Sequence, residues 1–206
     1  MKALRVVVNG FIAVTVVWVW MDMLVRNGGG RITGAGLDSL RYFTWLSNTW
    51  AGLAAVWWLL SRLMGKGRAL ADKIKYAASV SVGLTFLTVI GFLGPVFGFH
   101  TLFRGSGLWF HLIIPLIAVA ESIFLNETAL DLQDNVLAVL PVVGYGVYYL
   151  VNIAVNGIRR GRGTNDLYGF FTWGWFIGAL ILAALVGAAF LIGFMLRKAN
   201  GKIYGR

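Results

Sequence analysis

Six apolar runs, each about 20 residues long, constrain the fold more than any other feature of this sequence. They cover residues 3–25, 42–63, 74–99, 107–125, 136–156 and 173–196. A helix needs about 20 residues to cross the hydrocarbon core of a bilayer, because it rises about 1.5 Å per residue. The sequence therefore predicts an all-α, polytopic integral membrane protein. Its single domain, residues 1–206, is predicted to be a bundle of six transmembrane helices.

Composition agrees with this class of protein, since 59% of the 206 residues are hydrophobic and only 13% are charged. A transmembrane β-barrel would need runs of about ten residues in which polar and apolar side chains alternate, and these runs do not alternate. The sequence has no cysteine and only two histidines, so a zinc ligand set is hard to assemble. We therefore expect neither a metal nor another cofactor.

Basic residues are distributed unequally between the two sides of the predicted bundle. If the N-terminus is inside, 11 of the 18 Lys and Arg residues fall on the inner side and 7 on the outer side. Cytoplasmic connections carry such an excess, so we predict a membrane protein with both termini in the cytoplasm. Anionic headgroups explain the net charge of +10, and no nucleic-acid-binding motif is present. Membrane lipids are the expected partners, and the sequence predicts no particular oligomeric state.

Polar side chains inside the predicted helices gather at the outer end of the bundle. Thr44, Ser47 and Asn48 share one face of the second helix, because residues three and four apart are neighbours on a helix. His111 lies at a similar depth in the fourth helix, and Asp22 reaches the same end late in the first. A stripe on the fifth helix also rises toward this end and consists of Tyr145, Tyr148, Asn152 and Asn156. Such a layer predicts a reaction site or a binding site within the membrane.

The inner half of the bundle is predicted to be nearly featureless by comparison. The connection between the fourth and fifth helices contains Glu127, Asp131 and Asp134, and it is predicted to be a solvated turn. Glu121 lies ten residues beyond His111, which places it about 15 Å deeper along the same helix. Direct contact between Glu121 and His111 is therefore not expected.

Two short motifs give the chain a resemblance to a known family. Residues 43–48 (Phe-Thr-Trp-Leu-Ser-Asn) resemble the F-T-x-x-S-N signature of the bacterial Pr6Pr membrane proteins, grouped here with the eukaryotic androgen-induced and androgen-dependent (FAR-17a-like) proteins. Residues 111–115 (His-Leu-Ile-Ile-Pro) resemble the H-x-x-x-P motif of that group, and Glu121 stands where relatives often carry an acidic residue. The six-helix plan also matches. Residues 166–171 depart from the group, because they lack the prolines of its Y-P-Y-P-F-like run.

The resemblance implies an intramembrane hydrolase of lipid esters, such as fatty acid esters of hydroxy fatty acids. Carried over to this chain, Thr44 would be the nucleophile and His111 the general base. An imidazole suits that role because its ordinary pKa of about 6.5 lets it take a proton at neutral pH. The structural alternatives are hydrogen bonds from Thr44 and Ser47 to neighbouring helices or carbonyls, and a headgroup-level His111 without a catalytic role. The supporting or substrate-binding candidates are Ser47, Asn48, Asn152, Asp22 and Tyr148.

The supporting residues have chemical roles that the sequence leaves open. Asn48 or Asn152 would donate hydrogen bonds to the oxyanion that develops on the substrate carbonyl. Asp22 would orient the imidazole. The alternatives are an interhelical hydrogen bond for Asn48 and a salt bridge from Asp22 to Arg26 or Arg41.

A second hypothesis comes from a different functional class. The bundle would bind a small molecule or a lipid without transforming it, as the substrate-binding subunits of vitamin transporters do with about six helices. Both hypotheses predict an outward-facing polar pocket for a lipid ester or a small amphipathic molecule. They differ in whether the ligand is cleaved.

Overall fold

The computed structural model describes residues 2–27, 29, 36–158 and 164–205, and every regular element within these ranges is a helix. Two short helices, η1 (Leu37–Arg41) and α5 (Phe99–Leu102), join longer segments. The long segments are α1 (Lys2–Asn27), α2 (Phe43–Met64), α3 (Arg68–Thr88) continued by η2 (Val89–Leu93) and α4 (Gly94–Phe97), α6 (Ser106–Leu108) continued by η3 (Trp109–Ile113) and α7 (Ile114–Phe124), α8 (Leu132–Asn156) and α9 (Trp175–Ile203). The basic residues outside the described ranges are Arg31, Arg159, Arg160, Arg162 and Arg206.

Five helical segments in the described part of the chain are long and apolar enough to cross a membrane, which indicates a helical membrane protein. They are Ala3–Asn27, Arg68–Phe97, Ser106–Phe124, Leu132–Asn156 and Trp175–Ile203. The remaining long segment, α2, has 22 residues but is less hydropathic, because tryptophans and small polar residues occupy much of it. Five of the six predicted spans are thus supported, and the count of six is not confirmed.

Two predicted helix ends differ most from the observed ones. They are the start of the third predicted span and the end of the last predicted span. Helix α3 begins at Arg68 rather than at residue 74, and α9 ends at Ile203 rather than at residue 196. Charged side chains in these turns led the prediction to treat them as loops. Helix α3 begins earlier because Asp72 is buried against Arg5 of α1, and α9 continues because Asn200 is buried and donates to the Asn126 carbonyl.

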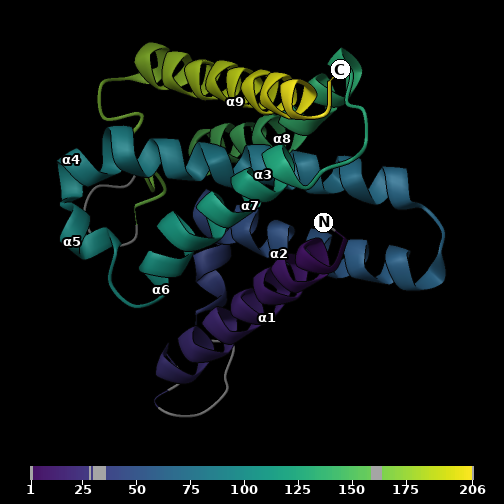
Figure 1. The fold of residues 1–206 in the computed structure, drawn as a ribbon. Helices are drawn as coiled ribbons and strands as arrows, with labels where there is room; N and C mark the ends of the chain where they lie inside the picture. The colour runs from purple at the N-terminus through teal and green to yellow at the C-terminus, as the bar shows by residue number, and fades with distance from the viewer. Residues whose placement is uncertain (1, 28, 30–35, 159–163, 206) are drawn as a thin grey trace.

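Helix α3 lies at the centre of the bundle, where it packs against α2, α7, α8 and α9 (Figure 1). Helix α1 covers α2 and α7 from the other side. Small side chains at the α1–α2–α3 contact, such as Ala51, Ala55 and Ala78, are fully buried and allow close approach of the helices. A side chain on Gly52 would collide with Val16 of α1, which explains the glycine there.

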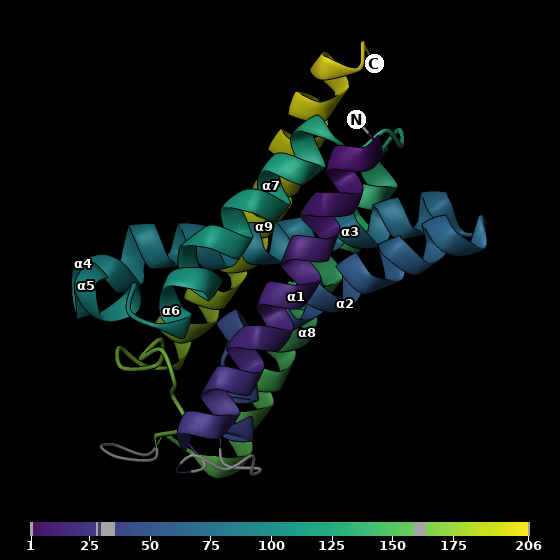
Figure 2. The same ribbon diagram turned by 60° about the horizontal axis from the view of Figure 1, so that its bottom comes forward.

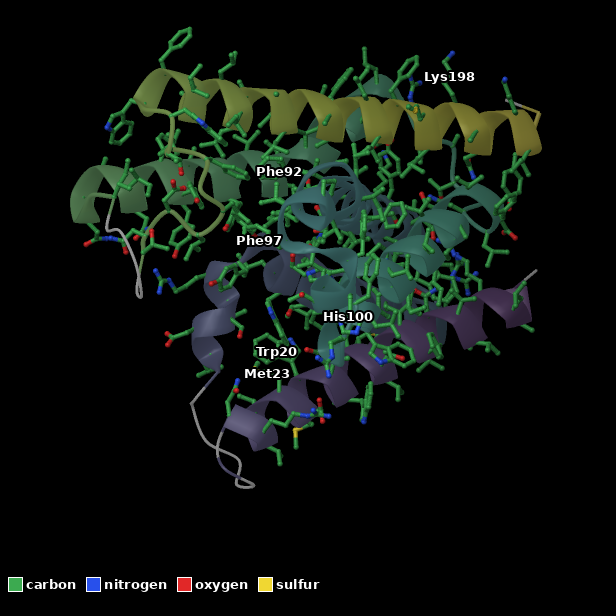
Figure 3. The ribbon with its side chains drawn as sticks, turned by 90° about the vertical axis from the view of Figure 1, so that its left-hand side faces the viewer. Trp20, Met23, Phe92, Phe97, His100 and Lys198 are labelled. Carbon is green, nitrogen blue, oxygen red and sulfur yellow. The ribbon has the colours of Figure 1, made fainter. Side chains whose placement is uncertain are left out.

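The start of α1 and the end of α9 lie at the same end of the molecule in both ribbon views (Figures 1 and 2). We call this end, which also holds the α2–α3 and α7–α8 connections, the inner end. Hydrogen bonds from Asn200 of α9 to the carbonyl of Asn126 fix the end of α9 beside the α7–α8 connection. Figure 3 shows Lys198 toward this inner end, and Trp20 and Met23 toward the opposite, outer end.

The inner half of the bundle is not featureless, so that prediction is wrong. Arg5, Asp72, Lys75 and Glu121 come together there as a buried group that we call the inner charge cluster. Arg5 forms ion pairs of 2.8 Å with Asp72 and 2.7 Å with Glu121, and Lys75 lies 3.0 Å from Glu121. Burying these charges is tolerated because each has an oppositely charged partner from another helix.

The α7–α8 connection is more ordered than a solvated turn, which corrects a second prediction. Asp131 caps α8: its carboxylate accepts a hydrogen bond from the backbone N–H of Asp134, and the Asp134 carboxylate accepts one from the N–H of Asp131. Asp134 is buried and also pairs with Lys73 at 2.8 Å. The backbone N–H of Asp134 keeps the pKa of Asp131 below its ordinary value.

Candidate functional site

Thr44 and His111, from two different helices at the outer end, line the same cavity. The cavity has a volume of about 230 Å³ and lies between the start of α2 and the α5–α6–η3 segment. We call it the Thr44–His111 cavity. Its other lining residues are Trp45, Thr101, Leu102, Arg104, Ser106, Gly107 and Phe110. The structure thus brings an alcohol and an imidazole to one small, partly polar space.

A π-helical turn, η3, determines how His111 is presented. Ile114 donates its N–H to the carbonyl of Trp109, five residues back, instead of to Phe110. In that register the Phe110 carbonyl would need the N–H of Pro115, which proline lacks. Asn48 of α2 supplies the missing donor, with its Nδ2 2.9 Å from the Phe110 oxygen. The H-x-x-x-P sequence and Asn48 are therefore linked by backbone hydrogen bonding.

The ring of His111 is held by a backbone carbonyl. Nδ1 of His111 lies 2.7 Å from the carbonyl oxygen of Leu102, and a carbonyl can only accept. Nδ1 therefore carries the proton and donates it, which in the neutral imidazole leaves a lone pair on Nε2. This is the tautomer that a general base needs when Nδ1 is the anchored nitrogen.

Thr44 also borders a second cavity, narrow and almost entirely apolar, between α3, α8 and α9. We call it the apolar cavity. Its lining residues are Phe43, Thr44, Leu84, Thr85, Thr88, Leu93, Val142, Tyr145, Gly146, Tyr168, Phe170, Leu182 and Leu185. Thr44 thus lies between a partly polar cavity on one side and an apolar cavity on the other.

The segment between α8 and α9 covers this region. Asp166 organises it, because one carboxylate oxygen accepts the O–H of Tyr149 at 2.6 Å and the other accepts the N–H of Phe171 at 2.9 Å. The Tyr168 phenol oxygen in turn accepts the backbone N–H of Phe43, at 2.8 Å, at the first residue of α2. Burial raises the pKa of Tyr168 to about 12, so its phenol is protonated at neutral pH.

A wide groove of about 710 Å³ runs along the outside of the bundle between α2 and α8. We call it the lateral groove. Predominantly apolar side chains line it, including Leu46, Leu53 and Pro141. Phe43 and Tyr145 line both the groove and the apolar cavity, and their ring centroids are 5.1 Å apart. This aromatic pair therefore separates the groove from the cavity beside Thr44.

Two of the supporting residues predicted from the sequence have structural hydrogen bonds near the site. Both N–H groups of Asn48 are used, one by the Thr44 carbonyl at 2.8 Å and one by the Phe110 carbonyl. Asn48 is therefore an interhelical link, which is one of its two predicted roles, and its side chain has no N–H left for an oxyanion. Ser47 bonds the Thr85 hydroxyl of α3 at 2.9 Å and also lines the lateral groove.

The other supporting candidates lie away from the Thr44–His111 cavity. Asn152 donates to the backbone carbonyl of Asn165 at 3.2 Å, so it anchors the α8–α9 segment instead of facing an oxyanion. Asp22 pairs with Arg26 at 2.8 Å, which confirms the salt-bridge alternative. The ring of His111 is held by the carbonyl of Leu102 instead of by Asp22. Tyr148 is 43% exposed and lines the lateral groove.

Reasoning from the sequence missed two parts of this site. Tyr168 belongs to residues 166–171, whose departure from the family pattern was evident, but no role was assigned to its phenol. The Leu102 carbonyl that holds His111 has no signal in the sequence, because any residue offers a carbonyl. Among the described residues, no three His, Asp or Glu side chains meet as a metal site requires.

Comparison with known proteins gave no match to a protein-family model, to a curated protein or to a solved structure. The fold defines the chain as a helical protein of the membrane class, on the strength of its long apolar helices. Its function is therefore argued from the geometry of the site.

Proposed function

We propose that this chain is a six-span membrane protein that hydrolyses lipid esters, with Thr44 as nucleophile and His111 as general base. The observation that carries the proposal is the shared cavity, in which a threonine hydroxyl and a correctly anchored imidazole line one space. The basic residues at the inner end favour cytoplasmic termini in a bacterial inner membrane. The site then lies near the outer headgroups, at the level where an ester bond of a lipid is found.

The reaction follows the usual course of acyl transfer to a hydroxyl nucleophile. Nε2 of His111 takes the proton of the Thr44 hydroxyl as its oxygen bonds to the ester carbonyl carbon. The tetrahedral intermediate collapses, the bond to the leaving alcohol breaks, and His111 returns the proton to that alcohol. Water, activated by the same imidazole, then cleaves the acyl-threonine ester and releases a carboxylic acid.

The surroundings of Thr44 indicate where each part of the substrate lies. The acyl chain lies in the lateral groove, whose volume of about 710 Å³ is large enough for it, because the apolar cavity beside Thr44 has a volume of only about 50 Å³. The alcohol portion faces the Thr44–His111 cavity, where Arg104 and Ser106 provide polar groups. This arrangement favours an ester with one apolar acyl chain and a more polar leaving group.

Tyr168 replaces Asn48 as our candidate for the oxyanion donor. Its phenol borders the same apolar cavity as Thr44 and is neutral at physiological pH. Removing one such donor from a hydrolase reduces kcat by about 100-fold to 1000-fold. We therefore expect Tyr168→Phe to lower kcat far more than KM.

The test uses the full chain in nanodiscs with a fluorogenic fatty acid ester. Thr44→Ala and His111→Ala should each abolish turnover above background, whereas His100→Ala, the same change at an exposed imidazole that lines neither cavity nor the groove, should leave kcat unchanged. Hydrolysis that survives both the Thr44 and the His111 substitutions would contradict the catalytic assignment.

A second measurement distinguishes an enzyme from a protein that only binds its ligand. Mass spectrometry after treatment with a fluorophosphonate should find a covalent adduct on Thr44, and His111→Ala should suppress it, because an unactivated hydroxyl reacts slowly. A chain that retains the ester intact, with no adduct, would instead be a lipid-binding or small-molecule-binding protein.

A further inference from the structure

A separate cavity at the inner end of the bundle does not include Thr44 and is lined by three arginines. It has a volume of about 280 Å³ and is lined by Arg5, Val6, Trp58, Arg62, Arg68 and Glu127. We call it the arginine cavity. Its residues come from α1, α2, α3 and the α7–α8 connection, so the folded bundle is needed to form it.

Two of the arginines have N–H groups without an acceptor among the described residues. Arg5 has a side chain that is only 4% exposed, and its Nη2 is buried with no hydrogen-bond acceptor among the described residues. Nε of Arg62 is likewise buried and lacks an acceptor in the described part of the chain. Buried donors of a charged group are costly when unpaired, so two of them beside one cavity point to an acceptor supplied by a ligand.

The arrangement of the charges identifies the kind of ligand. The guanidinium carbons of Arg5 and Arg62 each lie 4.7 Å from the ring centroid of Trp58, which holds two like charges close together. Arg68 is the first residue of α3, and the N-cap residue before it, Gly67, has no side chain that could cap the N–H groups of that helix terminus. The positive end of the α3 dipole therefore adds to the same field.

A balance of the charged groups in the arginine cavity and the adjoining inner charge cluster indicates that the ligand is an anion. These groups are the cations Arg5, Arg62, Arg68 and Lys75 and the carboxylates Asp72, Glu121 and Glu127. Four cations and three carboxylates leave one net positive charge. A phosphodiester carries one negative charge and offers several acceptor oxygens to a guanidinium fork.

We propose that the arginine cavity binds the phosphate of an anionic phospholipid headgroup at the inner end of the bundle. The headgroup phosphate accepts hydrogen bonds from Arg5 and Arg62, and Arg68 holds it from the rim. Trp58, which is 2% exposed and donates its indole N–H to Asp72 at 2.7 Å, keeps both guanidinium groups in place. This binding site is independent of the proposed hydrolase activity, because none of its residues borders the Thr44–His111 cavity.

Native mass spectrometry of the full chain in a neutral detergent tests the proposal. The chain is titrated with phosphatidylglycerol or with phosphatidylcholine of the same acyl chains, and the retained lipid is counted. We expect one tightly held phosphatidylglycerol, with at least about tenfold preference over phosphatidylcholine. Arg62→Gln and Arg68→Gln should each remove about tenfold in affinity, because each deletes a charged donor.

The matched control is Lys66→Gln, which removes the same charge from an exposed side chain in the α2–α3 connection but outside the cavity. It should leave the lipid preference unchanged. Arg62→Gln removes a contact with Asp72 and can disturb folding. Arg68 is exposed, so Arg68→Gln tests lipid binding without that complication. Equal retention of the two lipids by the wild-type chain, or an unchanged preference in Arg68→Gln, would overturn the proposal.

A competition experiment with inorganic phosphate distinguishes a lipid headgroup from soluble phosphate as the ligand. If inorganic phosphate at the concentration of the lipid does not displace phosphatidylglycerol, the headgroup assignment is supported. Displacement at that concentration would overturn the lipid assignment and identify the cavity as a site for soluble phosphate.

Discussion

Replacing Glu121 with Gln removes one charge from the inner charge cluster while keeping the size of the side chain. The carboxylate of Glu121 is 1% exposed and lies 2.7 Å from Nε of Arg5, 3.0 Å from Nζ of Lys75 and 3.1 Å from Nδ2 of Asn9. The variant leaves Lys75, whose side chain is 2% exposed, without a carboxylate partner among the described residues. Arg5 retains its ion pair with Asp72.

The expected loss of stability is large because the remaining charges stay buried. Breaking a buried ion pair by removing one partner costs about 3–5 kcal/mol. For a chain of 206 residues, each kcal/mol lowers Tm by about 2–4 °C, so we expect Glu121→Gln to lower Tm by about 10 °C. Thermal unfolding of the full chain in a neutral detergent, followed by circular dichroism, measures this shift.

Asp22→Asn is the matched control, since it makes the same chemical change in an ion pair at the surface. The side chains of Arg26 and Asp22 are 71% and 25% exposed, and such pairs contribute about 0–1 kcal/mol. If both variants lose the same Tm, burial of the cluster is not what makes it important. Adding Lys75→Met to Glu121→Gln should recover part of the loss, because it removes the unpaired cation; no recovery would refute the electrostatic explanation.

Three other predictions concern backbone and helix contacts, and each is measured as a change in the unfolding midpoint. Asn48→Leu should cost about 1–3 kcal/mol, because the carbonyl that Asn48 caps in η3 loses its donor; a neutral result would contradict that role. Gly193→Ala should cost about 1–3 kcal/mol through a clash with a side-chain amide of α8, whereas Gly187→Ala, where a Cβ meets nothing within 4 Å, should not destabilise. The pKa of Asp131 is lowered in the folded state, so its contribution to the free energy of unfolding is present above the unfolded pKa and is lost as pH falls through the folded pKa. Asp131→Asn should therefore weaken the loss of stability in acid. A variant whose unfolding midpoint depends on pH as the wild type does would contradict this role.

The helices and the main pair of the site were predictable because they depend on local patterns. Apolar runs predicted the long segments, and the shared depth of Thr44 and His111 on parallel helices predicted their meeting at one cavity. An interhelical hydrogen bond was one of the roles predicted for Asn48, but its acceptor was not predictable, because the bond depends on a π-helical turn in another helix and on a carbonyl that Pro115 leaves without a donor. Tyr168 escaped assignment for a similar reason, since its position depends on how Asp166 folds the α8–α9 segment.

The inner charge cluster was missed because ion pairs between distant residues leave no local pattern. Arg5 and Glu121 are 116 residues apart in the sequence. Arg5, Asp72 and Lys75 lie near predicted helix ends, where charged residues usually face water or headgroups. Glu121 was the available signal, because a carboxylate inside an otherwise apolar helix requires a cationic partner within the bundle.

The π turn in η3 lets the two ends of the fourth long segment change independently. An extra residue advances a helix by about 100°, so this turn sets the rotational phase of His111 relative to Glu121. Deleting one residue before His111 would leave its phase relative to Glu121 unchanged, whereas a deletion just after it would swing the imidazole around the helix axis. A one-residue deletion at this place in the turn would thus change the direction of the His111 ring at the outer end while the inner charge cluster keeps its contacts.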